Sequence, residues 1–293
     1  MKVLFYRRND GTSLDYVGRR VMENLSRKYE VKEQIIGQEL TAENIDIGVV
    51  YGLVRDLAYL KRHKRRFAGL VCEADLNDRE TEIIRRAELE EIWIPSKFCE
   101  EKFLKAGFKN LRIVPHGVDE VPVGKCTEDN VLMIYSSYPG LSWTTLRKRP
   151  FESIDAVRRN GRKLLLRTNK ERYYRRYEFP DIEFVGYQDN MDKLFDRCSS
   201  VLCPSDSEGF GLVGLEALAR GIPLISTHTG NDYLEGMHYI HIDLPVTSEK
   251  IYDALEKLYN NWYYHNEKAT EQRERVLEKY RWNNVLSNLH IKE

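Results

Sequence analysis

The sequence predicts an α/β protein with two doubly wound parallel sheets, each forming a Rossmann-like domain. Short apolar runs of strand length alternate along the chain with apolar residues at helical spacing, which is the pattern of repeated β-α units. A length of 293 residues suffices for two domains of ordinary size. A polar stretch with proline and glycine at 121–130 predicts the linker between them.

The first domain is expected at residues 1–120. Its strands are predicted where short apolar runs end in polar loops, at 2–6, 45–51 and 67–72. Helices are predicted after the first two runs, at 14–25 and 53–60.

The second domain is expected at residues 121–274. Its strands are predicted at 131–135, 163–168, 182–187, 201–203 and 223–226. Its clearest helices are predicted at 212–219 and 250–259.

Composition narrows the class of protein. The 46 basic residues balance 46 acidic ones, so wholesale binding to nucleic acid is not implied. The five cysteines are scattered without metal-ligand spacing, and Cys72 and Cys203 end apolar runs, so both are predicted to be buried thiols in a reducing compartment. Neither a signal peptide nor an apolar run of membrane-spanning length is visible, and a cytoplasmic location is expected.

The stretch 200–230 carries the clearest functional signal. An apolar strand ends at Cys203, a polar loop leads into Glu208-Gly209-Phe210-Gly211, and an apolar helix follows until Gly221. A glycine-bearing loop therefore lies between the carboxyl end of a strand and the start of a helix. Free backbone N–H groups and the helix dipole favour an anion such as phosphate at this place.

Two glutamates, Glu208 and Glu216, bracket this loop eight positions apart. Because a carboxylate repels a diphosphate, we expect both to accept hydrogen bonds from hydroxyl groups on either side of it. The stretch resembles the signature of the retaining GT-B glycosyltransferases, family 4 and the glycosyl transferases group 1 clan. The matching residues are Pro204, Ser205, Glu208, Gly209, Phe210, Gly211, Leu212, Leu215, Glu216, Ala217, Ala219, Gly221, Pro223 and Ile225.

The resemblance implies two domains that face each other across a cleft. It also implies transfer of a sugar from a nucleotide-diphosphate sugar to an unidentified acceptor, with retention of anomeric configuration and without a metal ion or other cofactor. Glu208 would hold the sugar hydroxyls, and Glu216 would accept hydrogen bonds from the ribose. The residues expected around the donor are Gly209, Phe210, Gly211, Leu212, Glu216, Arg147, Arg149, Gly186, Thr229, Gly230 and Gly11.

The second domain departs from the family where Gly-Arg usually follows its first strand, because Ser136 and Ser137 stand there. Lys148 has the spacing of the family lysine and is predicted to bind the donor phosphates. Arg147 or Arg149 is predicted to supply the missing arginine charge. An exposed basic turn is the alternative interpretation of these three residues.

The first domain also departs from the family. Its first loop contains only Gly11, which is predicted either to approach the donor or to be a turn residue. No histidine follows the strand at 67–72, so Glu73 or Asp75 is expected to contact or deprotonate the acceptor, with helix capping or a surface position as the alternative. His116 replaces a usual asparagine and is predicted to line the cleft or the hinge.

Further segments follow from the resemblance. Residues 91–96 and 97–106 resemble a strand of the family and the helix that follows it. A C-terminal helix at about 275–293 is expected to pack back onto the first domain. The basic run Lys61–Arg66 suggests a peripheral contact with anionic lipid head groups, although a solvated helix end is the favoured interpretation.

Other functions are weighed against transfer. A sugar-nucleotide epimerase and a non-catalytic sugar-nucleotide-binding protein remain alternatives, and the lost glycines, arginine and histidine favour the latter. A phosphorylase is disfavoured because no segment resembles its pyridoxal-binding site. A dehydrogenase would need G-x-G-x-x-G after the first strand, which residues 7–13 do not supply.

Overall fold

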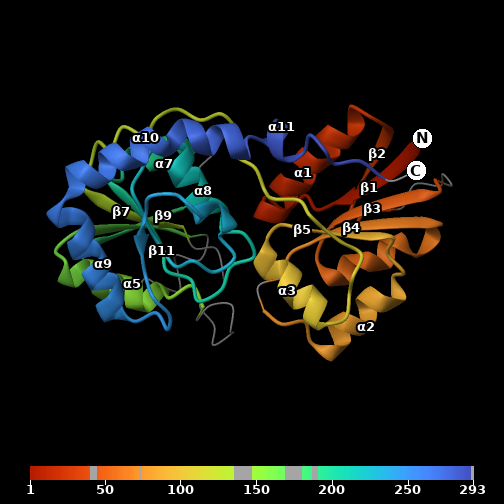
Figure 1. Ribbon diagram of the computed structural model, residues 1–293, viewed down its shortest axis with the longest axis horizontal. Helices are drawn as coiled ribbons and strands as arrows, with labels where there is room; N and C mark the ends of the chain where they lie inside the picture. Colours follow the sequence, from red (N-terminus) through yellow and green to blue (C-terminus); the bar gives the residue numbers. More distant parts are fainter. Residues whose placement is uncertain (40–44, 73, 135–146, 169–179, 187–190, 292–293) are drawn as a thin grey trace. The chain divides into compact units, whose positions relative to one another are not determined.

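The computed structural model describes residues 1–39, 45–72, 74–134, 147–168, 180–186 and 191–291. Its contacts divide the chain into two compact units (Figure 1). Unit 1 comprises Met1–Gly117 and Tyr280–Glu293, and unit 2 comprises Val118–Lys279. The predicted boundaries at 120 and 274 lie within a few residues of these divisions.

Unit 1 is built on a six-stranded sheet in the order β2-β1-β3-β4-β5-β6. Every neighbouring pair is parallel. The strands are β1 (Lys2–Arg7), β2 (Glu30–Ile35), β3 (Ile47–Gly52), β4 (Arg65–Leu70), β5 (Glu91–Ile94) and β6 (Leu111–Ile113). The helices are α1 (Ser13–Ser26), the 3₁₀ helix η1 (Val54–Arg62), α2 (Asp78–Arg86), α3 (Lys97–Lys105) and α11 (Trp282–Val285).

Unit 2 has a second six-stranded parallel sheet in the order β12-β11-β10-β7-β8-β9. The strands are β7 (Asn130–Ile134), β8 (Lys163–Arg167), β9 (Ile182–Val185), β10 (Ser200–Cys203), β11 (Leu224–Ser226) and β12 (Ile240–His241). The helices are α5 (Pro150–Arg159), α7 (Met191–Asp196), α8 (Leu212–Ala219), the 3₁₀ helix η3 (Asp232–Leu234), α9 (Ser248–Asn260) and α10 (Trp262–Tyr280).

Helices cover both faces of the unit 2 sheet (Figure 1). Leu164 and Leu166 of β8 join the core with Val157 of α5 and Leu255 of α9. Because side chains alternate along a strand, Arg167 lies on the other face, which α7 and α8 cover in Figure 1. The predicted fold class, two parallel α/β domains, is confirmed.

Three elements of unit 1 were not predicted: β2, the three-residue strand β6 and helix α2. Strand β2 lies at the edge of the sheet, and Gln34 is its only buried residue, so it lacks the apolar run that marks the other strands. Helix α2 begins at a capping box in which the Asn77 side chain accepts from the Glu80 amide. This short helix buries only Thr81 and Ile84, so its apolar pattern is weak.

The basic run Lys61–Arg66 is not a single solvated helix end, contrary to the favoured interpretation. Helix η1 ends at Arg62, and β4 begins at Arg65, so the strand predicted at 67–72 lies two residues earlier than expected. Ion pairs engage three of the cations: Lys64 with Asp46 at 2.9 Å, Arg65 with Glu90 at 2.8 Å and Arg66 with Glu88 at 3.2 Å. These pairs reduce the positive charge that an anionic lipid surface would attract.

The C-terminal segment of unit 1 packs on α1. The Trp282 indole donates to the Tyr16 hydroxyl at 2.9 Å, and their rings meet edge to face. Lys28 donates to the Leu289 carbonyl at 2.8 Å. The C-terminal segment that begins at Tyr280 is therefore part of unit 1, together with the N-terminal residues.

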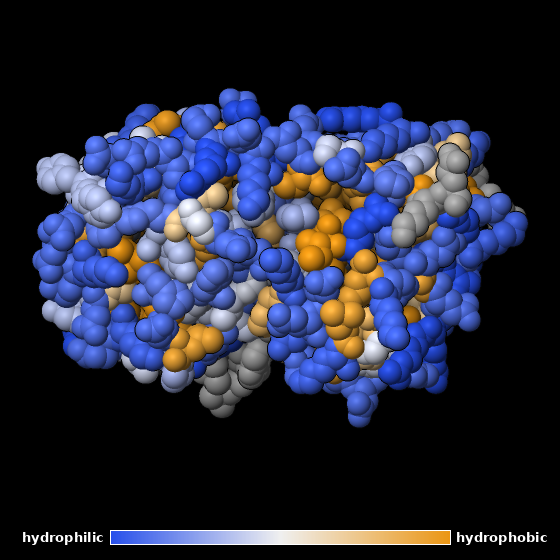
Figure 2. All heavy atoms as spheres, in the orientation of Figure 1, coloured by the Kyte–Doolittle hydropathy of each residue, from blue (hydrophilic) through white to orange (hydrophobic). Residues whose placement is uncertain are grey.

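Hydrophilic side chains cover most of the molecular face in Figure 2. Within the described ranges, no helix has the length and apolar character needed to cross a bilayer. None of the five cysteines, all of which the structure describes, forms a disulfide. Cys72 is buried as predicted. Cys203 is only half-buried, because it is the last residue at the carboxyl end of strand β10.

Candidate functional site

The candidate site is the loop of residues 204–211, which connects the carboxyl end of β10 to α8. Strand β10 lies between β11 and β7 in the sheet, so the loop leaves a central strand. Ser205, Glu208 and Phe210 are buried, with 2%, 8% and 2% of their surface exposed. The loop is therefore an ordered part of unit 2.

Gly211 sets the start of α8. It caps the helix in the left-handed conformation, with φ 71° and ψ 52°. A Cβ atom there would lie 2.0 Å from Oδ1 of Asn231, so only glycine fits without rearrangement. The Gly211 carbonyl accepts from the Tyr233 hydroxyl at 2.6 Å. Asn231 and Tyr233, which the sequence did not single out, thus hold the helix start in place.

Gly230 allows the loop after β11 to approach the site. A Cβ atom at Gly230 would lie 1.7 Å from the Glu208 carbonyl oxygen. Thr229 and Thr227 both donate to the Ser205 carbonyl, at 3.2 and 2.6 Å. Thr229 and Gly230, both predicted site residues, therefore support the 204–211 loop from behind its backbone.

The structure brings Lys148 and Glu208 together. The Lys148 ammonium forms an ion pair with Oε1 of Glu208, which also accepts from the Ser205 hydroxyl at 2.8 Å. The Glu208 side chain is 10% exposed and that of Lys148 is 22% exposed. A cation and a carboxylate, each predicted to act on the same donor, thus meet at one point of the loop.

The two arginines beside Lys148 contact the loop and neighbouring carboxylates, and the prediction that one of them supplies charge to the donor phosphates stays a prediction. Arg147 is buried and donates to the Ser207 carbonyl at 2.7 Å. Arg149 pairs with Asp206 at 2.5 Å and with Glu152 at 2.9 Å. Two carboxylates balance the charge of Arg149, so its contribution to an anion site is small.

Glu216 lies on the second turn of α8 and is half-buried. Burial raises the pKa of its carboxyl group, and the nearby Arg220 guanidinium opposes that shift. Leu212, another predicted site residue, begins the same helix. The first N–H groups of a helix have no intrahelical acceptor, so this end of α8 presents donors to an anion.

Two residues lie where neighbouring strands end at the same edge of the sheet, and Gly186 is the predicted one. Gly186 follows β9 and is exposed, with open space where a Cβ would lie. Arg167, which sequence reasoning did not assign to the site, ends β8 between Ile134 of β7 and Val185 of β9. Its positive charge acts on Glu216 and, like that of Arg220, opposes the rise in the pKa of that carboxyl group.

In unit 1, the structure favours a turn role for Gly11. It has a φ of 66° just before the cap of α1, and its N–H donates to Asp15 at 3.2 Å. Because a carboxylate already occupies that N–H group, a direct role in phosphate binding is disfavoured.

Asp75 does not suit the predicted role of base. It pairs with Lys102 at 2.8 Å and Lys105 at 2.5 Å, and these hydrogen bonds lower its pKa to about 2. A weakly basic carboxylate held by two lysines is a poor proton acceptor. Glu73 and the predicted Ser136–Ser137 departure lie outside the residues that the structure describes.

His116 is buried in unit 1, and its Nε2 atom lies 2.8 Å from the Tyr51 hydroxyl. Burial lowers its pKa to about 3. The imidazole is therefore neutral at physiological pH.

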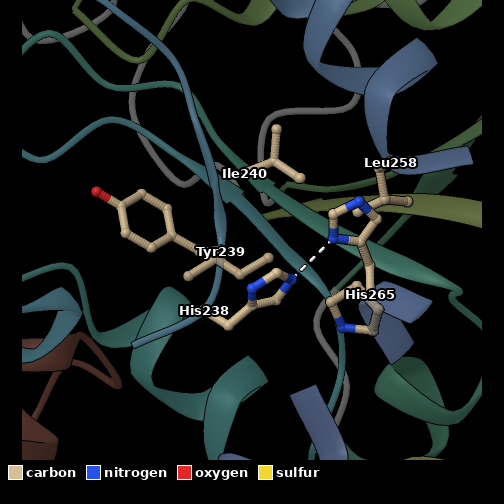
Figure 3. Close-up of a pocket in the computed structure, with 7 residues that line it drawn as sticks. His238, Tyr239, Ile240, Leu258 and His265 are labelled. Carbon is tan, nitrogen blue, oxygen red and sulfur yellow. Dashed lines mark hydrogen bonds between the residues drawn. The ribbon is translucent and has the colours of Figure 1, made fainter. Parts of the chain in front are cut away.

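A separate hollow in unit 2 contains a histidine pair (Figure 3). The rings of His238 and His265 stack with centroids 5.0 Å apart, and Nε2 of His238 lies 2.8 Å from Nδ1 of His265. His238 precedes β12 at the amino edge of the sheet, whereas the 204–211 loop leaves the carboxyl edge. The pair is therefore remote from the candidate site.

A metal site is not apparent in the part of the chain that the structure describes. No group of three or more histidine, cysteine, aspartate or glutamate residues there could hold a metal ion.

Known proteins resemble this chain both in the sequence around the site and in the fold. Residues 152–261, which include Glu208 and Glu216, match the family model described as Glycosyl transferases group 1. Anabaena Alr3699/HepE in complex with UDP-glucose superposes with a TM-score of 0.77 at 12% identity, covering 98% of this chain and 97% of that one. The chain has the GT-B glycosyltransferase fold. The GT-B fold that the sequence resemblance implied is thus confirmed.

Two other solved structures have a similar fold. Sucrose-phosphate synthase from Thermosynechococcus elongatus has a TM-score of 0.73 at 13% identity, covering 97% of this chain and 96% of that one. WaaG, a glycosyltransferase involved in lipopolysaccharide biosynthesis, has a TM-score of 0.69 at 13% identity, covering 98% and 99%.

Curated relatives match shorter segments. An uncharacterized glycosyltransferase of Methanocaldococcus jannaschii, MJ1607, is 27% identical over 108 residues, which are 36% of this chain and 28% of that protein. N-acetyl-alpha-D-glucosaminyl L-malate synthase of Bacillus anthracis is 47% identical over 47 residues, 16% of this chain and 12% of that protein. The chain thus spans only a minor part of the length of either relative.

Proposed function

We propose that this protein is a retaining glycosyltransferase, which moves a sugar from a nucleoside-diphosphate sugar to an acceptor. The observation that carries the proposal is the ion pair of Lys148 and Glu208 on the loop that leads into α8. At this loop the Lys148 ammonium, the Glu208 carboxylate and the N-terminus of α8 lie together. A cation and a helix N-terminus can bind phosphate, and a carboxylate can accept hydrogen bonds from sugar hydroxyls. The group 1 match over residues 152–261 supports the same activity.

The diphosphate would bind at the start of α8. The backbone N–H groups of Gly209, Phe210 and Gly211 precede the helix, and those of Leu212 and Val213 lie too near its start to have an acceptor within the helix. Gly211 carries no Cβ, so a phosphate oxygen can approach the backbone closely. The helix dipole adds a favourable field for the negative charge.

Lys148 would neutralise the charge that develops on the leaving nucleotide. Its ammonium has three N–H donors, so it can contact a phosphate oxygen while it remains bound to Glu208. A cation placed where negative charge appears in the transition state typically contributes about 10²–10³-fold in rate. The proposed reaction needs no metal ion for this role.

The two glutamates would bind the parts of the donor on either side of the diphosphate. Glu208, oriented by Lys148 and Ser205, would accept hydrogen bonds from the sugar hydroxyls and stabilise positive charge near the anomeric carbon. Glu216 would accept hydrogen bonds from the ribose hydroxyls. The departing phosphate would take the proton of the attacking acceptor hydroxyl, on the face from which the nucleotide leaves, and the anomeric configuration would be retained.

The donor can be sought without knowing the acceptor. UDP-glucose is the first compound to test, since HepE was solved in complex with it. A ligand that binds the folded state raises the unfolding temperature, so a panel of nucleoside-diphosphate sugars should give a thermal shift with at least one member. Hydrolysis or transfer of that donor is then measured for the wild type and for Glu208→Gln.

Glu208→Gln is expected to reduce turnover by about 10²–10³-fold, because the neutral amide cannot stabilise positive charge at the anomeric carbon. Glu267→Gln is the matched control, since Glu267 is exposed on α10, and its turnover should equal that of the wild type. Equal turnover of Glu208→Gln and the wild type would contradict the proposal. A thermal shift without any turnover would instead favour a non-catalytic binding protein.

A further inference from the structure

Arg220 is a buried cation directly behind the proposed ribose site. It caps the C-terminus of α8 and is only 5% exposed. Its guanidinium donates to the Glu216 carbonyl at 3.1 Å and to Asp192 at 2.7 Å. The same group lies 4.2 Å from the centre of the Phe195 ring.

These contacts fix the guanidinium in one place. Burying a cation is costly unless it is paired and hydrogen-bonded, and Arg220 has a carboxylate, a carbonyl and an aromatic face. The side chain of Asp192 is 41% exposed, so it can interact with water as well as with Arg220. Arg220 follows Glu216 by one helical turn, and its contact with the Glu216 carbonyl ties it to the turn that carries the carboxylate.

Opposing charges surround Glu216. The groups that act on it are Arg220, Asp119, Arg167, Asp192 and the Cys203 thiol. Burial raises the pKa of Glu216, and Arg220 is the largest influence that lowers it. Without Arg220, the carboxylates of Asp119 and Asp192 would be opposed by Arg167 alone among the described groups.

We propose that Arg220 is a positioning residue for the donor, which holds the helical turn that presents the Glu216 carboxylate and keeps a positive charge beside that turn. This inference rests on the proposed function, because it assumes that Glu216 accepts hydrogen bonds from the ribose. A carboxylate accepts at both oxygens, whereas a protonated carboxyl group loses acceptor capacity. Donor affinity should therefore fall as pH falls through the raised pKa of Glu216.

The test is the pH dependence of the donor dissociation constant, measured with the nucleoside-diphosphate sugar that gives the largest thermal shift. In Arg220→Gln, the midpoint of the affinity loss should move upward by about one pH unit or more, since a nearby opposite charge shifts a pKa by that amount. Arg220→Lys should keep most of the wild-type midpoint. Glu216→Gln should lose this pH dependence, and kcat at saturating donor should change little in Arg220→Gln.

Asp192→Asn separates a charge effect from loosened packing. It removes a negative charge that raises the pKa of Glu216, so the midpoint should move downward, opposite to Arg220→Gln. Because Asp192 is partly exposed, this variant shows whether neighbouring charges set the midpoint even where Arg220→Gln does not fold. A purely structural role of Arg220 predicts weaker binding with an unmoved midpoint in Arg220→Gln.

The outcomes distinguish the two proposals. Wild-type binding with opposite midpoint shifts in the two variants supports the role of Arg220. Wild-type binding with unmoved midpoints overturns that role alone. A wild type that binds no member of the panel overturns the proposed function and this inference with it.

Discussion

Replacing Gly230 by alanine should destabilise unit 2 and displace Glu208. The backbone of Gly230 has a φ of 71°, and left-handed backbone costs a residue with a Cβ about 1–2 kcal/mol. The new methyl group would lie 1.7 Å from the Glu208 carbonyl oxygen, a backbone atom that cannot turn away. Overpacking of this kind costs about 1–3 kcal/mol more. The expected loss in the free energy of unfolding is about 2–5 kcal/mol.

Gly161→Ala is the matched control for this variant. Gly161 also has a φ of 71°, but nothing lies within 4 Å of the position of its Cβ. It should lose only the backbone cost of about 1–2 kcal/mol. Urea unfolding followed by circular dichroism compares the two variants, through the shift in midpoint at unchanged slope. Equal losses would refute the close approach of Gly230 to Glu208.

Two further predictions concern charge. His116, buried with a pKa of about 3, should make unit 1 less stable as pH falls below about 6.5, since only the unfolded chain then takes up the proton. The loss should reach about 2 kcal/mol at a pH of about 5, and His116→Asn should remove that part of the slope in urea unfolding measured across pH. Lys148→Met should lower turnover at saturating donor by about 10²–10³-fold, with partial recovery in Lys148→Arg. Unchanged turnover in Lys148→Met would exclude Lys148 from leaving-group stabilisation.

The features that could be read from the sequence are those encoded within a short stretch. The strand that ends at Cys203, the glycine loop and the helix from Leu212 lie where their residue types predict them. The start of α8 is predictable because Gly211, directly before the apolar helix residues, tolerates the left-handed conformation of the cap. Strand β2 escaped prediction because an edge strand with one buried residue has no apolar signature.

Features that depend on distant contacts were not readable. Lys148 and Glu208 lie 60 positions apart, and their pairing depends on the fold of unit 2. The neighbouring Arg147 and Arg149 carry the same charge as Lys148, and only the position of the 204–211 loop shows that they support it. Arg220 had a local signal, an arginine one turn after Glu216 at the helix end, but its burial against Phe195 comes from tertiary packing.

The most direct test of the proposed site is a crystal structure of the protein with the nucleoside-diphosphate sugar that gives the largest thermal shift. We expect the pyrophosphate oxygens to accept hydrogen bonds from backbone N–H groups at 209–212 and from Lys148. A pyrophosphate bound away from the start of α8, with Glu208 and Glu216 contacting no part of the ligand, would contradict the account.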